Sequence, residues 1–61
     1  MSARHHAARQ RRTFIARVAR TMHRERGHVS PSEITHAAIC AGWKTSNTEV
    51  RHVLTRLRLH R

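Results

Sequence analysis

The sequence predicts an all-α fold: a three-helix bundle that contains a helix-turn-helix and carries a basic N-terminal arm. Apolar residues recur at helical spacing in three segments, and no segment alternates apolar and polar residues as a strand would. Two serine-to-glutamate pairs, Ser30 with Glu33 and Ser46 with Glu49, have the spacing of capping boxes and mark two helix starts. With 61 residues, the chain has room for one domain with a small core.

The arm is expected over residues 1–12, which hold arginines and histidines among small residues and have no apolar face. Such a segment is flexible when free, or helical from about Ala7, because Ala, Arg and Gln favour helix. It serves either as a solubilising tail or as an arm that follows DNA phosphates or enters a minor groove. In the second case the phosphate-contacting residues are Arg4, Arg9, Arg11 and Arg12.

The domain proper is expected over residues 13–61 and begins with a helix over residues 13–26. Thr13 would cap this helix if the arm is not helical, and Gly27 ends it. One apolar stripe faces the core. It consists of Phe14, Val18 and Met22, spaced by fours, and of Ile15 and Ala19.

The second helix is expected over residues 31–41. Ser30 is its N-cap, Pro31 takes the first helical position, and Val29 can pack against Ile34 across the cap. Its inner face is narrow and made mostly of small residues, which let a neighbouring helix approach closely. This face consists of Ile34, Ala37, Ala38 and Ala41.

Gly42 ends the second helix, because glycine readily adopts the left-handed conformation found at helix C-termini. Trp43 then folds back onto the last turn. Cys40 is expected to be a small buried or half-buried filler, and Ile39 lies off the inner face.

The third helix is expected from Asn47 to about Leu59. Its inner face consists of Val50, Val53, Leu54 and Leu57. On the opposite side Asn47, Arg51, Thr55 and Arg58 fall in one axial row.

The second and third helices resemble the helix-turn-helix of bacterial and phage DNA-binding proteins. Ala38 is followed four residues later by Gly42 and then by the apolar Trp43, as in that motif. The apolar pair of the second motif helix, Val50 and Val53, comes two residues later than usual. The resemblance therefore implies a small three-helix domain with a lengthened turn. The chain stops after the third helix, so we expect no β-hairpin wing.

The resemblance implies that the third helix lies in the major groove of double-stranded DNA and reads bases. The base-reading residues would be Ser46, Asn47, Thr48, Arg51, His52 and Thr55. Arg51 is the best candidate for a bidentate guanine contact, whereas Asn47 reads adenine or only helps to cap the helix. Further phosphate contacts would come from Ser32, Lys44, Thr45, Arg56, Arg58 and Arg61.

Charge favours the same partner. Thirteen Lys and Arg face three Glu, a formal net charge of +10, so the chain needs a polyanionic partner. We expect a sequence-specific transcriptional regulator, phage- or plasmid-borne. Three alternatives stay open: a nonspecific nucleoid or architectural DNA binder, a module that binds an acidic protein surface of the transcription machinery, and an RNA or ribosome binder.

The chain has no apolar run of signal-peptide or membrane-span type, so we expect a cytoplasmic, nucleoid-associated protein without membrane contact. A homodimer is expected to be possible, because specific sites are usually read by two recognition helices. Ile39, Leu59 or the surface of the first helix would supply the contact.

An enzyme is not expected, because the chain has no aspartate and its three glutamates fall at caps or on the surface. His36 and Cys40 have the spacing of two zinc ligands, but no second pair completes a site, so neither a metal nor another cofactor is expected. The seven histidines are expected at the surface, where they add positive charge below neutral pH and strengthen DNA binding.

Overall fold

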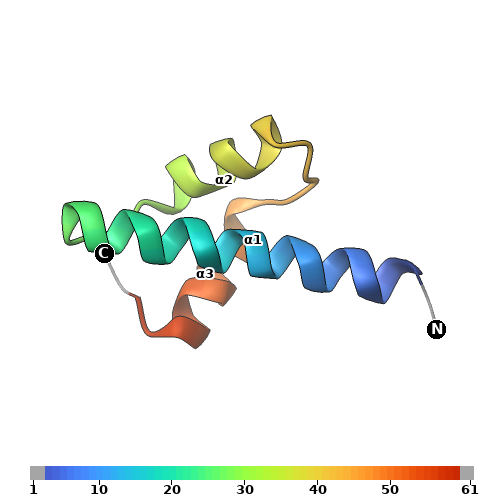
Figure 1. The fold of residues 1–61 in the computed structure, drawn as a ribbon, viewed down its shortest axis with the longest axis horizontal. Helices are drawn as coiled ribbons and strands as arrows, with labels where there is room; N and C mark the ends of the chain where they lie inside the picture. The colour runs from blue at the N-terminus through green and yellow to red at the C-terminus, as the bar shows by residue number, and fades with distance from the viewer. Residues whose placement is uncertain (1–2, 60–61) are drawn as a thin grey trace.

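The computed structural model describes residues 3–59, which form three helices (Figure 1). These are α1 (Ala3–Arg26), α2 (Pro31–Cys40) and α3 (Asn47–Leu57). Each helix packs against the other two, and residues 3–59 contain no strand. The predicted all-α three-helix bundle is confirmed.

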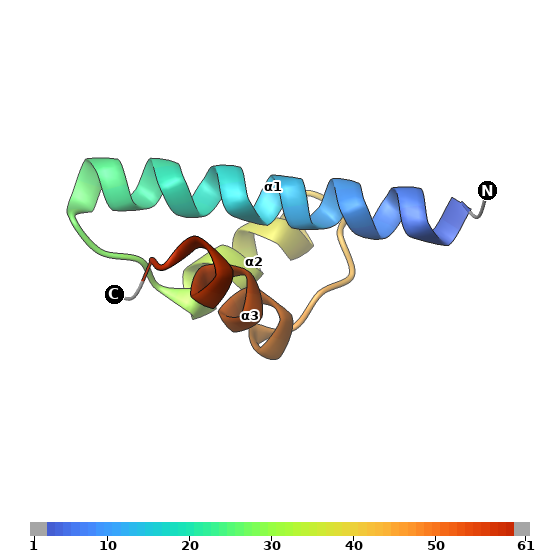
Figure 2. The same cartoon turned by 90° about the horizontal axis from the view of Figure 1, so that it is seen from below.

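Helix α1 runs the length of the molecule. Its 24 residues, at about 1.5 Å each, measure about 36 Å, close to the longest dimension of 38 Å. Helices α2 and α3 pack on its middle and C-terminal parts, so its first turns project beyond them (Figures 1 and 2). Thr13 lies inside α1, where its Oγ1 donates a hydrogen bond to the Arg9 carbonyl at 2.9 Å, so it is not the N-cap.

The core lies where the three helices meet. Ile15, Ile34 and Val50, one from each helix, are its largest fully buried side chains. The remaining members of the buried cluster are Ala19, Val29, Val53 and Leu54, with Ala38 also buried in α2. Ile15 and Ala19 form the centre of the α1 stripe, and the other three predicted members lie half-buried beside them. These three are Phe14, Val18 and Met22.

The connection from α1 to α2 is short and well bonded. Gly27 has a φ of +78°, and its N–H donates to the His23 carbonyl at 2.8 Å, so it ends α1 as predicted. Val29 turns into the core, and Ser30 caps α2 by accepting the Glu33 N–H at its Oγ. The Ser30 N–H donates to Met22 Sδ at 3.3 Å, which ties the cap to α1.

The burial of three residues in and after α2 differs from the prediction. Thr35 is buried although it is polar, because its hydroxyl is satisfied by the Pro31 carbonyl at 2.8 Å. Ala41 was expected inside, but it follows the last helical residue and is exposed. Cys40 is exposed and not a buried filler, because the helix turns it away from α1 and α3.

Residues 41–46 form the lengthened turn between α2 and α3. Gly42 has a φ of +94°, its N–H donates to the Ile39 carbonyl at 3.0 Å, and the Trp43 N–H reaches back to Ala38 at 2.9 Å. This pair of bonds is a Schellman motif, the predicted helix end. The Trp43 ring lies 6.1 Å from the Phe14 ring, so the turn also packs on α1.

Helix α3 ends two residues before the expected Leu59. Arg58 adopts the left-handed conformation with a φ of 58°, and the Leu59 N–H donates to the Leu54 carbonyl at 2.9 Å. Leu59 thereby folds back against the core and is half-buried. Ile39 is 54% exposed, as its place off the inner face of α2 predicted.

Candidate nucleic-acid interface

The outer face of α3 is open to solvent. All of its sequence-predicted base-reading residues are exposed: Ser46, Asn47, Thr48, Arg51, His52 and Thr55. They lie outside because Val50, Val53 and Leu54 fix the opposite side of the helix in the core. Figure 2 shows α3 at the surface of the bundle, and no described element covers its outer side.

Two hydroxyls of this outer face already have partners within the helix. Ser46 Oγ accepts the Glu49 N–H at 3.3 Å, and Thr55 Oγ1 donates to the Arg51 carbonyl at 2.9 Å. Ser46 therefore keeps its hydroxyl proton for a further acceptor, and Thr55 keeps its lone pairs for a further donor. The guanidinium of Arg51 is exposed.

The predicted phosphate-contacting residues divide into three groups. Six of them are exposed: Arg9, Arg12, Ser32, Lys44, Arg56 and Arg58. Arg11 and Thr45 are half-buried and held by Glu49. The Arg4 side chain and the whole of Arg61 lie outside the described residues.

Glu49 joins α1 to the start of α3. Arg11 Nη2 donates to Oε2 at 2.8 Å, and Arg11 Nε lies 2.7 Å from Oε1 without an aligned hydrogen bond. Thr45 Oγ1 donates to Oε1 at 2.6 Å. Both partners of the ion pair are about a quarter exposed. This cluster gives Arg11 and Thr45 a structural role, so they are poorly placed to bind phosphate.

Glu33 makes the corresponding contact for α2. Arg26 Nη1 donates to both carboxylate oxygens, at 2.9 and 3.0 Å, and the pair is about half exposed. Both glutamates of the predicted capping boxes therefore turn to arginines of α1, while the two serines keep their capping role. Two of the three acids of the chain are neutralised in this way.

We expect the fold to lose stability below about pH 4.5, the ordinary pKa of glutamate. Burial raises the pKa of Glu49. The hydrogen bonds from Arg11 and Thr45 and the charge of Arg11 lower this pKa by more than burial raises it. The net pKa is below the ordinary value, so the stabilisation is present above pH 4.5 and is lost as acid protonates the folded carboxylate. Urea unfolding measured across this pH range tests the expectation.

The matched variants are Glu49→Gln and Glu33→Gln. Glu49→Gln should lower the free energy of unfolding at pH 7 by about 1 kcal/mol and reduce the acid sensitivity. Glu33→Gln removes an exposed pair, in which the hydrogen bond from Arg26 is the main cause of the lowered pKa of Glu33. Its effect should be smaller. Equal effects of the two changes would contradict the structural role of the Glu49 cluster.

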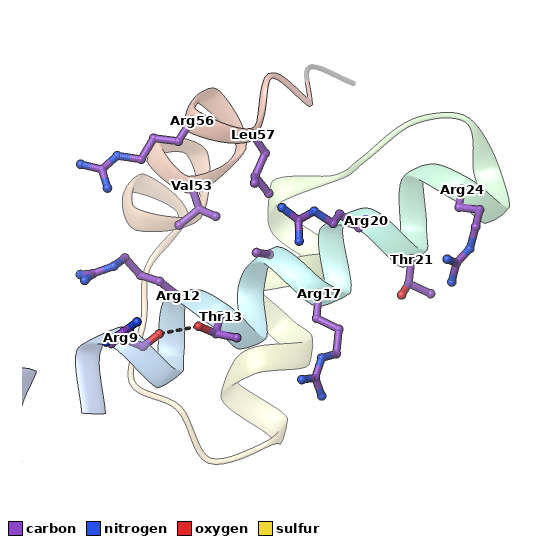
Figure 3. A pocket seen from close by; sticks show the side chains of 11 residues that line it. Arg9, Arg12, Thr13, Arg17, Arg20, Thr21, Arg24, Val53, Arg56 and Leu57 are labelled. Atoms are coloured by element: carbon purple, nitrogen blue, oxygen red, sulfur yellow. Dashed lines mark hydrogen bonds between the residues drawn. The ribbon is translucent and has the colours of Figure 1, made fainter. Parts of the chain in front are cut away.

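An open groove of about 670 Å³ runs between the exposed sides of α1 and α3, above the place where the two helices pack together (Figure 3). Its floor includes the apolar side chains of Ala16, Val53 and Leu57. Six arginines line it: Arg9, Arg12, Arg17, Arg20 and Arg24 from α1, and Arg56 from α3. We call this feature the arginine groove. No acidic residue lines it, and its six arginines form no ion pair within the described part of the chain.

The sequence-derived site did not include Arg17, Arg20 and Arg24. Their spacing indicates a shared face. Arg17 precedes Arg20 by three residues and Arg24 follows Arg20 by four, so all three lie on one face of a helix. What the spacing does not show is that α3 lies beside this face. Arg56 completes the groove only through that packing.

The described residues contain no cluster of three or more histidine, cysteine or acidic side chains that suits a metal ion. Cys40 Sγ lies 3.5 Å from His36 Nε2 in an exposed pair on α2. None of the described helices combines the length and apolar character needed to cross a membrane. Comparison with known protein families, curated proteins and solved structures found no match to this chain.

Proposed function

We propose that this protein binds double-stranded DNA and acts as a small sequence-specific regulator, with α3 in the major groove. One observation carries the proposal: the outer face of α3 is exposed along its whole length and presents only polar and basic side chains. The helix has 11 residues, about 16 Å of axis, and a major groove about 12 Å wide admits an α-helix.

The residue types on this face suit base edges. The Arg51 guanidinium can donate two hydrogen bonds to the O6 and N7 of a guanine, and the Asn47 amide can pair with the N6 and N7 of an adenine. Both lie near the N-terminal half of α3, the part of a recognition helix that enters deepest. Lys44, exposed on the turn before α3, is placed to meet a phosphate beside this contact.

The charge distribution supports an anionic partner on this side of the molecule. Glu49 is the one acid within α3, and Arg11 and Thr45 hold its carboxylate against α1. It therefore opposes an approaching phosphate less than a free carboxylate would. The formal net charge of +10 adds a long-range attraction for any duplex.

The test begins with selection of bound fragments from random duplex DNA, followed by Arg51→Ala. We expect a preferred sequence, and we expect Arg51→Ala to weaken binding to it by about 1–3 kcal/mol with little effect on random DNA. Arg26→Ala, on α1 and away from α3, is the matched control and should leave the preference unchanged.

Two outcomes would count against the proposal. If selection yields no preferred sequence, the protein is a nonspecific DNA binder. If Arg51→Ala weakens specific and random binding equally, Arg51 contacts a phosphate and α3 does not read bases through it. Circular dichroism of each variant should show unchanged helix content, because both side chains are exposed.

A further inference from the structure

We infer that the arginine groove seats one phosphate backbone of the duplex, the strand that borders the major groove holding α3. The inference rests on the proposed function and extends it, because it assigns α1 as the second DNA-binding element. In this arrangement α3 lies on one side of the strand and α1 lies on the other, and the sugar–phosphate ridge runs between them.

The shape and chemistry of the groove match such a ridge. Arginines line the groove from both helices, five from α1 and Arg56 from α3, and Figure 3 shows Arg12 and Arg56 extending toward the same side. A guanidinium can bind a phosphate through two parallel hydrogen bonds. The apolar floor between the arginines suits the deoxyribose carbons, which phosphates flank.

The groove is continuous with the outer face of α3. A neighbouring hollow is lined by His52 and Thr55 of that face together with Arg12 and Arg56 of the groove. Glu49 also lines this hollow, with its carboxylate bound by Arg11 and Thr45. A duplex that placed bases against α3 would therefore bring its bordering strand to Arg12 and Arg56. This continuity favours DNA over an acidic polypeptide, which would have no reason to meet both surfaces at once.

The length of the groove fits several phosphates. Arg9 and Arg24 are 15 residues apart (24 − 9), about 22 Å of helix axis. A DNA strand carries one phosphate for each 3.4 Å of duplex axis, so a strand that runs along the groove presents several phosphates to its arginines. The six arginines have no acidic partner among the described residues, so binding a phosphate breaks no ion pair of the fold.

The experiment compares Arg20→Gln with Arg26→Gln. Both remove one positive charge from α1, but Arg20 lines the groove and Arg26 lies outside it, paired with Glu33. The affinity for a short fluorescent duplex of random sequence is measured against salt concentration. Arg20→Gln should reduce the slope of log K against log salt by about 1 and weaken binding about tenfold near 0.1 M salt. Arg26→Gln should leave the slope unchanged.

The inference is overturned if the two variants have the same slope. The change in slope would then depend on the net charge of the protein and not on the position of the arginine in the groove. It is also overturned if Arg20→Gln binds DNA normally but loses affinity for poly-L-glutamate, since the groove would then receive an acidic polypeptide. Failure of the proposed function is separate: if Arg51→Ala does not alter sequence preference while Arg20→Gln reduces the slope, the groove binds DNA and α3 is not the reader.

Discussion

Replacing Ile15 with alanine should lower the free energy of unfolding by about 3 kcal/mol and leave most of the protein unfolded at 25 °C. Ile15 is fully buried near the middle of α1, in one cluster with the core residues of α2 and α3. Removing its side chain beyond Cβ loses buried apolar surface and leaves a cavity, a combination that costs about 2–5 kcal/mol. A domain of 61 residues has about that much stability in total.

Ile39→Ala is the control, because it is the same chemical change at an isoleucine that is 54% exposed. Urea titration followed by far-ultraviolet circular dichroism should give a change below about 0.5 kcal/mol for this variant. If the two alanine variants unfold at the same urea concentration, Ile15 does not occupy the centre of the core.

The second large effect concerns binding. Between 50 and 200 mM salt, the affinity of the wild-type protein for duplex DNA should fall about a thousandfold or more, provided that about six phosphates are contacted. Six is the number of arginines in the groove. Fluorescence anisotropy with a short duplex at several salt concentrations gives the slope directly.

The same salt series should not unfold the protein. Salt screens the repulsion among the thirteen basic residues, so the helix content should hold or rise while the affinity falls. A loss of affinity of only about tenfold would correspond to about two phosphates, and it would show that most of the arginine groove stays outside the complex.

The fold was predictable to a large extent because each helix has its own local signals. Ser30 and Ser46 cap α2 and α3 at the expected residues, and Gly27 and Gly42 end the preceding helices with positive φ. These features depend on neighbouring residues in the chain, which the sequence displays directly. Ala41 was misplaced because helical spacing puts it on the inner face, whereas it is the C-cap at the very end of α2 and is exposed there.

The ion pairs could not be predicted in the same way. The spacing of Ser46 and Glu49 indicated a carboxylate that folds back on its own cap, whereas in the structure it reaches Arg11, which is 38 residues away in the chain. Which acid meets which arginine depends on how α1 packs, and twelve arginines offered many partners. Thr35 was missed for a different reason: its side chain is polar, but its hydroxyl is satisfied locally by the Pro31 carbonyl of the same helix, so it can be buried.

The sequence predicted the part of the candidate site that lies on α3, but it missed the arginines of α1 that line the groove. The outer face of α3 follows from helical periodicity alone, since Val50, Val53 and Leu54 fix which side is inside. The arginine groove requires a second helix beside it, and no local pattern states that α1 and α3 are neighbours. The groove therefore exists only in the packed structure, where α3 lies beside α1.

The projecting start of α1 implies a gradient of local stability along that helix. Among residues 7–10, the part of this end whose side chains the structure describes, no hydrogen bond or ion pair to α2 or α3 supports the helix. Its backbone amides there should exchange with solvent far faster than those near Ala19, because they can open without disturbing the core. The end of α1 can thus unwind and re-form independently, and a duplex that touched it would meet a helix whose length adjusts to the contact.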